Sequence, residues 1–179
     1  MKDDLKITLV PSQKLRTKSR TVESDELGAE LDAYMDNMLV KMYQLNGVGL
    51  AGIQVGDDRR LLVADAGSGP AKMVNPEILE LSEEKVTYTE GCLSIPGLRV
   101  PVERSEHIKL RYLTPHGEII EGVLSGLHSV VIQHEIDHLD GKTLLDKVSG
   151  LKRSMYLKKL KKKKKLQKKM LKELKRYGY

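Results

Sequence analysis

The segment VVIQHEIDHLDG, residues 130–141, places two histidines and a glutamate among mostly apolar side chains. His134 and His138 are four residues apart, so on an α-helix both imidazoles lie on one face and can bind the same ion. Glu135 follows the first histidine and lies beside that point, where it can take a proton from a water molecule. The apolar neighbours favour burial, and buried imidazoles without a partner are costly. The pattern therefore predicts a buried helix that binds a metal.

A third protein ligand is expected, because catalytic metal sites of this kind combine three protein ligands with one open position for water. Besides the carboxylates, the candidates are Cys92, His107, His116 and His128. His107 lies in a strand pattern and His116 in a turn, so we expect both to be solvated. His128 lies on the opposite side of the helix from His134. Cys92 lies in TEGCLSIPG, where glycines and a proline restrict the backbone, and it is the favoured third ligand. The alternative for a lone cysteine is a small buried hydrophobe.

Basic and acidic residues are unevenly distributed along the chain. Residues 158–176 contain 12 Lys or Arg and one Glu, whereas the rest of the chain has 19 basic and 24 acidic residues. The start, MKDDLKITLV, lacks the basic residues and long apolar core of a signal peptide, and no apolar run reaches the roughly 18 residues of a membrane span. We therefore expect a cytoplasmic protein with no membrane partner. Its single cysteine excludes a disulfide within the chain.

The spacing of apolar residues predicts three helices. One covers 24–44, with Ser24 as its N-cap, and the others cover 125–141 and 151–177. Apolar and β-branched stretches predict strands at 59–66, 71–81, 85–89, 107–114 and 118–124. Because these elements do not alternate as βαβ units, we expect an α+β fold with mostly antiparallel sheets around the central metal-binding helix, plus N-terminal and C-terminal helices. We expect a catalytic domain at 1–150 and a basic helical extension at 151–179.

Three segments resemble the signature motifs of the peptide deformylase family, in the same order: GVGLAGIQVG (47–56), EGCLSIPG (90–97) and QHEIDHLDG (133–141). The likeness extends over most of residues 5–155. The resemblance implies an enzyme that removes the formyl group from the N-terminal formyl-methionine of nascent polypeptides. One departure is Gly52, which stands where an alanine is common in the family.

The resemblance also implies roles for particular residues. Cys92, His134 and His138 resemble the ligands of one divalent metal, most often Fe(II), for which zinc, nickel or cobalt can substitute. Glu135 resembles the general acid and base. Gln54 resembles the side chain that hydrogen-bonds the formyl oxygen, together with the backbone N–H of Leu93.

The family binds its substrate peptide as an added strand, which would lie beside Gly49 and Gly91. The residues that resemble the lining of the methionine pocket are Val48, Glu90, Leu127, Val130 and Val131. The alternative for the last three is that they are ordinary core residues. Arg99 is a candidate for contact with the peptide further out, and the alternative is an ordinary surface arginine.

The lysine-rich segment 157–179 is predicted to bind RNA, because so many positive charges on one helix attract a phosphate backbone. By resemblance to bacterial family members, the partner would be the ribosome. The alternatives are a solvated helix without a partner and, less favoured, contact with an anionic membrane. Two other classes of function remain open: a metalloprotease with the same His-Glu-x-x-His chemistry, and a non-enzymatic RNA-binding protein with a structural metal.

Overall fold

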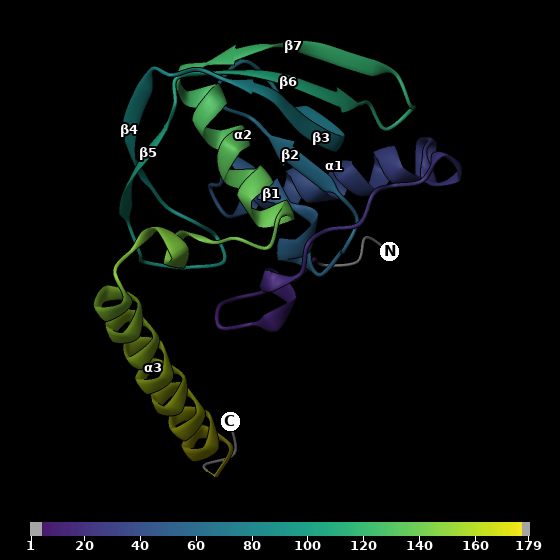
Figure 1. The fold of residues 1–179 in the computed structure, drawn as a ribbon. Coiled ribbons are helices and arrows are strands. Elements are labelled where there is room, and N and C mark those ends of the chain that lie inside the picture. The colour runs from purple at the N-terminus through teal and green to yellow at the C-terminus, as the bar shows by residue number, and fades with distance from the viewer. Residues whose placement is uncertain (1–4, 177–179) are drawn as a thin grey trace. The chain divides into compact units, whose positions relative to one another are not determined.

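Two antiparallel sheets surround the helix that carries His134 and His138 (Figure 1). The protein is represented by a computed structural model, and the structure is described for residues 5–176. The larger sheet has the strand order β1-β2-β3-β6-β7, and the smaller sheet pairs β4 with β5. All of these pairings are antiparallel, which confirms the expected α+β class. The strands are Gly49–Ala51 (β1), Leu61–Ala64 (β2), Ala71–Leu81 (β3), Lys85–Glu90 (β4), Val100–Ser105 (β5), His107–Leu113 (β6) and Ile119–Ser125 (β7). The helices are Ala29–Gln44 (α1), Gly126–Leu139 (α2) and Gly150–Arg176 (α3).

The side chains of β2 alternate between two cores, as the two-residue period of a strand requires. Leu62 and Ala64 belong to the core that includes residues of α2. Leu61 and Val63 belong to the core that includes residues of α1. The large sheet is therefore covered on one face by α2 and on the other by α1. The helix α2 also contacts β5 of the small sheet.

The helix α2 is buried at ten of its fourteen positions, so its polar side chains need partners inside the protein. Part of that need is met by β5. Ser129 donates a hydrogen bond from Oγ to the carbonyl of Ser105 at 2.9 Å, and Gln133 donates one from Nε2 to the same carbonyl at 2.8 Å. These bonds fix the rotation of α2 about its axis. They thereby determine which way His134 and His138 point.

The predicted start of the first helix was wrong. The helix α1 begins at Ala29, after Gly28, whose φ of 127° is outside the helical region. Ser24 instead begins a separate 3-10 turn, in which the carboxylate of Glu26 accepts a hydrogen bond from the N–H of Glu23 at 3.0 Å. The apolar spacing of the sequence continues through both pieces. It therefore did not reveal that the backbone turns between them.

Five predicted strands are present as β2, β3, β4, β6 and β7, with ends shifted by a few residues. Two strands were not predicted. The strand β1 has only three residues and lies in the glycine-rich segment. The strand β5 contains Pro101 and charged residues, which hid its pattern. Its buried residues Val100, Val102 and Arg104 nevertheless alternate with exposed ones.

The chain divides into two compact units, Met1–Leu144 and Leu145–Tyr179. In the second, the guanidinium of Arg153 donates a hydrogen bond to the carbonyl of Leu145 at 2.8 Å, which holds the start of α3 to the preceding 3-10 turn. The helix was predicted at 151–177, and residue 177 lies outside the described residues. Among the helices that the structure describes, none combines the length and the apolar character needed to cross a membrane.

Candidate metal centre

Cys92, His134 and His138 lie together, with one possible ligand atom from each within 4.8 Å of the others. Both histidines are buried on α2, and Cys92 lies just after β4. The Sγ of Cys92 is 3.1 Å from Nε2 of His138. The rings of the two histidines meet edge to face, with centroids 5.1 Å apart. Within residues 5–176, no other three histidines, cysteines or carboxylates are grouped in this way.

These three side chains fit a divalent metal. The Nδ1 of His138 is buried without a hydrogen-bond partner, and burial lowers the pKa of this imidazole well below its usual value, so it is a neutral donor. Burial also opposes the charge on His134, but hydrogen bonds to Cys92 and Glu90 outweigh burial and raise its pKa to about 10. The set therefore offers a neutral imidazole, a second imidazole held by Glu90, and the sulfur of Cys92. A borderline divalent cation satisfies the same set of donors.

The carboxylate of Glu135 is buried next to this group of donors. Burial raises the pKa of Glu135 to about 7, and its Oε2 has no hydrogen-bond partner. Its Oε1 lies in the space that a β-carbon on Gly49 would occupy. A β-carbon at position 49 would therefore displace the Glu135 side chain, a reason for glycine that the sequence did not reveal. A carboxyl group that titrates near neutral pH can both accept and release a proton during a reaction.

The amide of Gln54 has a fixed orientation. Its Oε1 accepts a hydrogen bond from the N–H of Ala51 at 2.8 Å, which leaves the Nε2 group to face the opposite way. That Nε2 lies 3.1 Å from Oγ of Ser94 and 3.6 Å from Sγ of Cys92. Among the described residues, the N–H of Leu93 donates to no backbone carbonyl. Two N–H donors therefore lie close to Cys92.

A chain of three charged residues supports His134, and only one of them, Arg104, lies outside the three motifs. Glu90 accepts a hydrogen bond from Nδ1 of His134 at 2.7 Å and two from the guanidinium of Arg104, at 2.7 and 3.0 Å. The same guanidinium donates to Asp137 at 2.6 Å. Burial by itself would raise the pKa of Glu90, but the bonds from Arg104 and His134 lower it overall. Glu90 therefore remains a carboxylate that orients His134, leaving its Nε2 for a metal.

Arg104 and Asp137 were not predicted as parts of the site. Asp137 is within the third motif, but its spacing from His134 gave no reason to connect it with Arg104. The only signal for Arg104 is the alternation of β5, which puts residue 104 on the same buried face as Val100 and Val102.

A groove of about 570 Å³ runs past the donors. Almost all predicted site residues line it, namely Val48, Gly49, Gln54, Glu90, Gly91, Cys92, Leu93, Arg99, Leu127, Val130, Val131, His134 and Glu135. Val130 and Val131 are buried, whereas Leu127 is 40% exposed. The guanidinium of Arg99 lies over Gly91, where an added β-carbon would be 3.3 Å from it. The strand β1, which provides Gly49, is at the edge of the large sheet and thus leaves backbone groups available for pairing.

The remaining histidines lie away from the donors and have other neighbours. His107 is 3.8 Å from a carboxylate oxygen of Glu84, and His116 is 3.6 Å from one of Asp32. His128 pairs with Ser68 at 2.7 Å. None of the three is in the group with His134 and His138.

Comparison with known proteins identifies the family. The family model described as polypeptide deformylase matches residues 4–154. The chain belongs to this family. A peptide deformylase of Phenylobacterium zucineum is 46% identical over 161 residues, which cover 87% of this chain and 94% of the relative. The resemblance noted in the three motifs is therefore confirmed, and with it the expectation of a hydrolase that deformylates peptides.

Solved structures of deformylases have the same fold. The peptide deformylase of Ehrlichia chaffeensis is 33% identical, with a TM-score of 0.84, and the match covers 91% of this chain and 98% of that one. A class I type b deformylase from Acinetobacter baumannii with Met-Ala-Ser bound is 34% identical, with a TM-score of 0.79, over 83% of this chain and 100% of that one. The deformylase family is metal-dependent, which agrees with the group formed by Cys92, His134 and His138.

Proposed function

We propose that this protein hydrolyses the N-formyl group of formyl-methionine at the start of nascent polypeptides and releases formate. The observation that carries this proposal is the convergence of three metal donors, a buried carboxyl group and two N–H donors on one groove. Each of these parts has a separate task in the hydrolysis of a formamide.

Cys92, His134 and His138 would hold one divalent metal per chain, and we favour Fe(II), for which zinc, nickel or cobalt can substitute. When bound, such a metal acts as a Lewis acid that activates water at neutral pH and polarises a carbonyl group. The carboxylate of Glu90, held by Arg104, keeps His134 in the orientation that this role needs.

Glu135 is the proton carrier in this proposal. Its carboxylate takes a proton from the attacking water, while the water oxygen forms a bond to the formyl carbon. The same carboxyl group then gives the proton to the methionine nitrogen as its bond to the formyl carbon breaks, and the remaining proton passes from formic acid to the amine. Formate and a free N-terminal amine result. A pKa of about 7 suits both steps, because a general base and acid works best near the operating pH.

Gln54 and Leu93 stabilise the negative charge that develops on the formyl oxygen. The Nε2 of Gln54 and the N–H of Leu93 would donate to that oxygen, and each donor of this kind contributes roughly 10²–10³-fold in rate. The bond from the Ala51 N–H to Oε1 of Gln54 supports this role, because it holds the amide with its N–H₂ side toward the groove.

The peptide would bind in an extended conformation beside Gly49 and Gly91, with its backbone paired to the edge strand β1. Its methionine side chain would contact Val48, Glu90, Leu127, Val130 and Val131, and Arg99 would contact residues further along. Backbone pairing does not read side chains, so we expect weak sequence preference after the methionine. The Acinetobacter baumannii relative binds Met-Ala-Ser, which supports a peptide that begins with methionine as the ligand of this groove.

The division into a catalytic domain at 1–150 and a basic extension at 151–179 is part of the proposal. The lysines at 161–165 are exposed on α3, and we assign them to the phosphate backbone of ribosomal RNA. Binding there would keep the enzyme close to emerging formylated chains in the cytoplasm.

The test is formate release by protein purified without oxygen, using formyl-Met-Ala-Ser as substrate and acetyl-Met-Ala-Ser as the matched control. We expect formate from the first and negligible acetate from the second. The rival metalloprotease predicts cleavage within a longer, N-terminally blocked peptide. Such cleavage without formate release would exclude the proposed function.

A further inference from the structure

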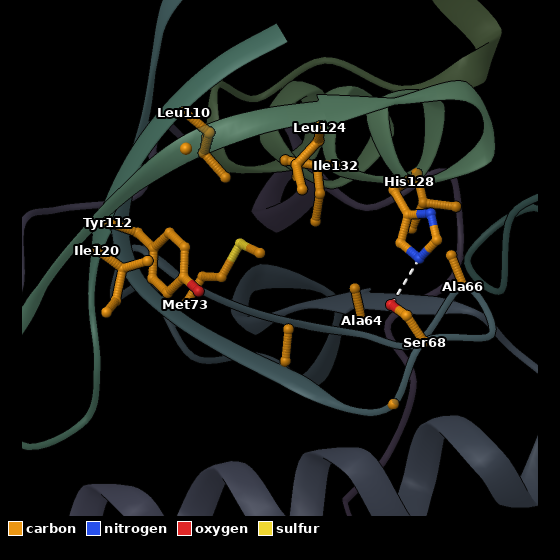
Figure 2. A pocket seen from close by; sticks show the side chains of 14 residues that line it. Ala64, Ala66, Ser68, Met73, Leu110, Tyr112, Ile120, Leu124, His128 and Ile132 are labelled. Carbon is orange, nitrogen blue, oxygen red and sulfur yellow. Dashed lines mark hydrogen bonds between the residues drawn. The ribbon is translucent and has the colours of Figure 1, made fainter. Parts of the chain in front are cut away.

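A second cavity, of about 170 Å³, lies between α2 and the large sheet (Figure 2). Its walls come from strands β2, β3, β6 and β7, from the loop after β2, and from the first half of α2. Figure 2 shows Tyr112 and Met73 on one side of this space and the pair His128–Ser68 on the other. No motif of the sequence and no part of the proposed reaction uses it.

The space exists because the sheet residues that face α2 are small at this place. Ala64 and Ala71 are opposite one another in the β2–β3 register, and Gly122 is opposite Leu110 in the β6–β7 register. A β-carbon added to Gly122 would meet no heavy atom within 4 Å. Ser68, Gly69, Ile120 and Gly122 on its walls are exposed, so the cavity opens to solvent and a small molecule can enter it without displacing a side chain.

The walls of this cavity are mostly apolar, with the hydroxyl of Tyr112 on one side and a polar end formed by the pair Ser68–His128. Met73, Leu110, Leu124 and Ile132 provide the apolar surface. At the polar end, Oγ of Ser68 lies 2.7 Å from Nε2 of His128, and no charged side chain lines the cavity. A hydroxyl that is bound to one partner can still form another hydrogen bond, so Ser68 can also bind a ligand.

We propose that this cavity is a binding site for a small aromatic molecule with one hydroxyl group, of the size of phenol. A dry apolar cavity of about 150 Å³ in another protein binds benzene, so the volume here suits a single ring and excludes a peptide. The uncharged walls exclude ionic ligands, which would lose their hydration without compensation. The ring lies against Met73 and Ile132, and its hydroxyl bonds to the Ser68–His128 pair.

This site is separate from the substrate groove, but Val131 lines both. Val131 and Ile132 precede His134 on the same helix. A ring bound against them therefore stabilises the folded position of α2, and it raises the melting temperature as the ligand concentration rises above the dissociation constant.

The direct test follows the ¹³C-labelled methyl group of Met73 by NMR while phenol is added to the metal-loaded protein. We expect a saturable shift with a dissociation constant that is roughly millimolar, as the few atoms of phenol allow. Met38, which is buried in the other core, serves as the internal control and should not shift. Absence of a saturable shift of Met73 up to the solubility of phenol would overturn the proposal.

A variant that fills the cavity identifies the site. Residues 120, 122 and 124 lie on one face of β7, so the side chain of Gly122→Leu points into the space. We expect this variant to abolish the Met73 shift, whereas Val123→Leu on the outer, exposed face should leave it unchanged. An unchanged Met38 signal in Gly122→Leu would establish that the variant is folded. Phenol binding by this folded variant as tight as that of the wild type would refute the site.

The hydroxyl preference is tested at the Ser68–His128 pair. We expect the wild type to bind phenol roughly five-fold more tightly than benzene, as one hydrogen bond provides, and the double variant Ser68→Ala/His128→Leu to bind both equally. Equal affinities in the wild type would contradict the role of the Ser68–His128 pair.

Discussion

The carboxylate of Glu135 occupies the space that a β-carbon on Gly49 would need. One residue is on the central helix and the other is on a three-residue edge strand. The helix can bring its carboxylate this far only because the strand has no side chain there. The position of the proposed proton carrier thus depends on a glycine in a different motif.

Gly49→Ala should therefore impair the reaction without removing the metal. The added methyl group displaces the end of the flexible Glu135 side chain, and a displacement of about 1 Å can cost roughly 100-fold in kcat. We expect a loss of that order in formate release, with metal content near that of the wild type. The matched control is Gly150→Ala, where an added β-carbon meets no heavy atom within 4 Å. Wild-type kcat in Gly49→Ala would show that the contact does not position Glu135.

Arg104 should be important for stability. Its side chain is 5% exposed, and that of its partner Glu90 is 6% exposed. Arg104→Met leaves the Glu90 carboxylate buried without this cation, which should lower the free energy of unfolding by about 3 kcal/mol. Urea unfolding of the metal-loaded wild type and variant measures this change in the free energy of unfolding. The double variant Glu90→Gln/Arg104→Met should recover part of the loss, because it removes the buried charge. Stability no better than that of Arg104→Met alone would argue against this explanation.

The ion pair of Arg20 and Glu26 should make stability depend on pH. The guanidinium donates to both carboxylate oxygens, at 2.6 and 2.8 Å, and this bond is the main cause that lowers the pKa of Glu26 from 4.5 to about 2. Because the pKa is lowered in the folded protein, the ion pair stabilises the fold fully above about pH 4.5. This contribution is lost as the pH falls toward 2. The difference in melting temperature between wild type and Glu26→Gln should therefore shrink from pH 6 to pH 3. A difference that grows on acidification would contradict this sign.

The basic extension should matter for ribosome binding and not for chemistry. A protein truncated after residue 156 should turn over a small formyl peptide at the wild-type rate and bind ribosomes more weakly. Glutamine at the five lysines 161–165 is the matched control that keeps the helix length, and it should reduce the salt dependence of binding. Ribosome affinity that is unaffected by the truncation would leave α3 without this role.

The proposed metal donors could be predicted because their signal is local. His134 and His138 are one helical turn apart, and Cys92 lies between glycines in a short motif. The overall class also followed from the sequence, since the alternation of strands is a property of each segment alone. By contrast, the start of α1 depends on a turn at Gly28 that the apolar pattern does not register.

The roles of Arg104 and Gly49 could not be predicted from the sequence, because each depends on a contact with a distant segment of the chain. Arg104 meets Glu90 and Asp137 only after β5 has paired with β4 and packed against α2. Ser68 and His128 are 60 residues apart in the sequence and meet at one end of the second cavity. Contacts between distant segments depend on strand register and packing, and a single short motif determines neither.

The most direct test compares the wild type with Glu135→Gln, which keeps the size of the side chain and removes its ability to carry the proton. Both proteins are purified without oxygen, and metal content and formate release from formyl-Met-Ala-Ser are measured on the same samples. We predict one divalent metal per chain in both and formate from the wild type alone, with the variant reduced by at least about 100-fold. Equal formate release by the metal-loaded variant would contradict the proposed mechanism.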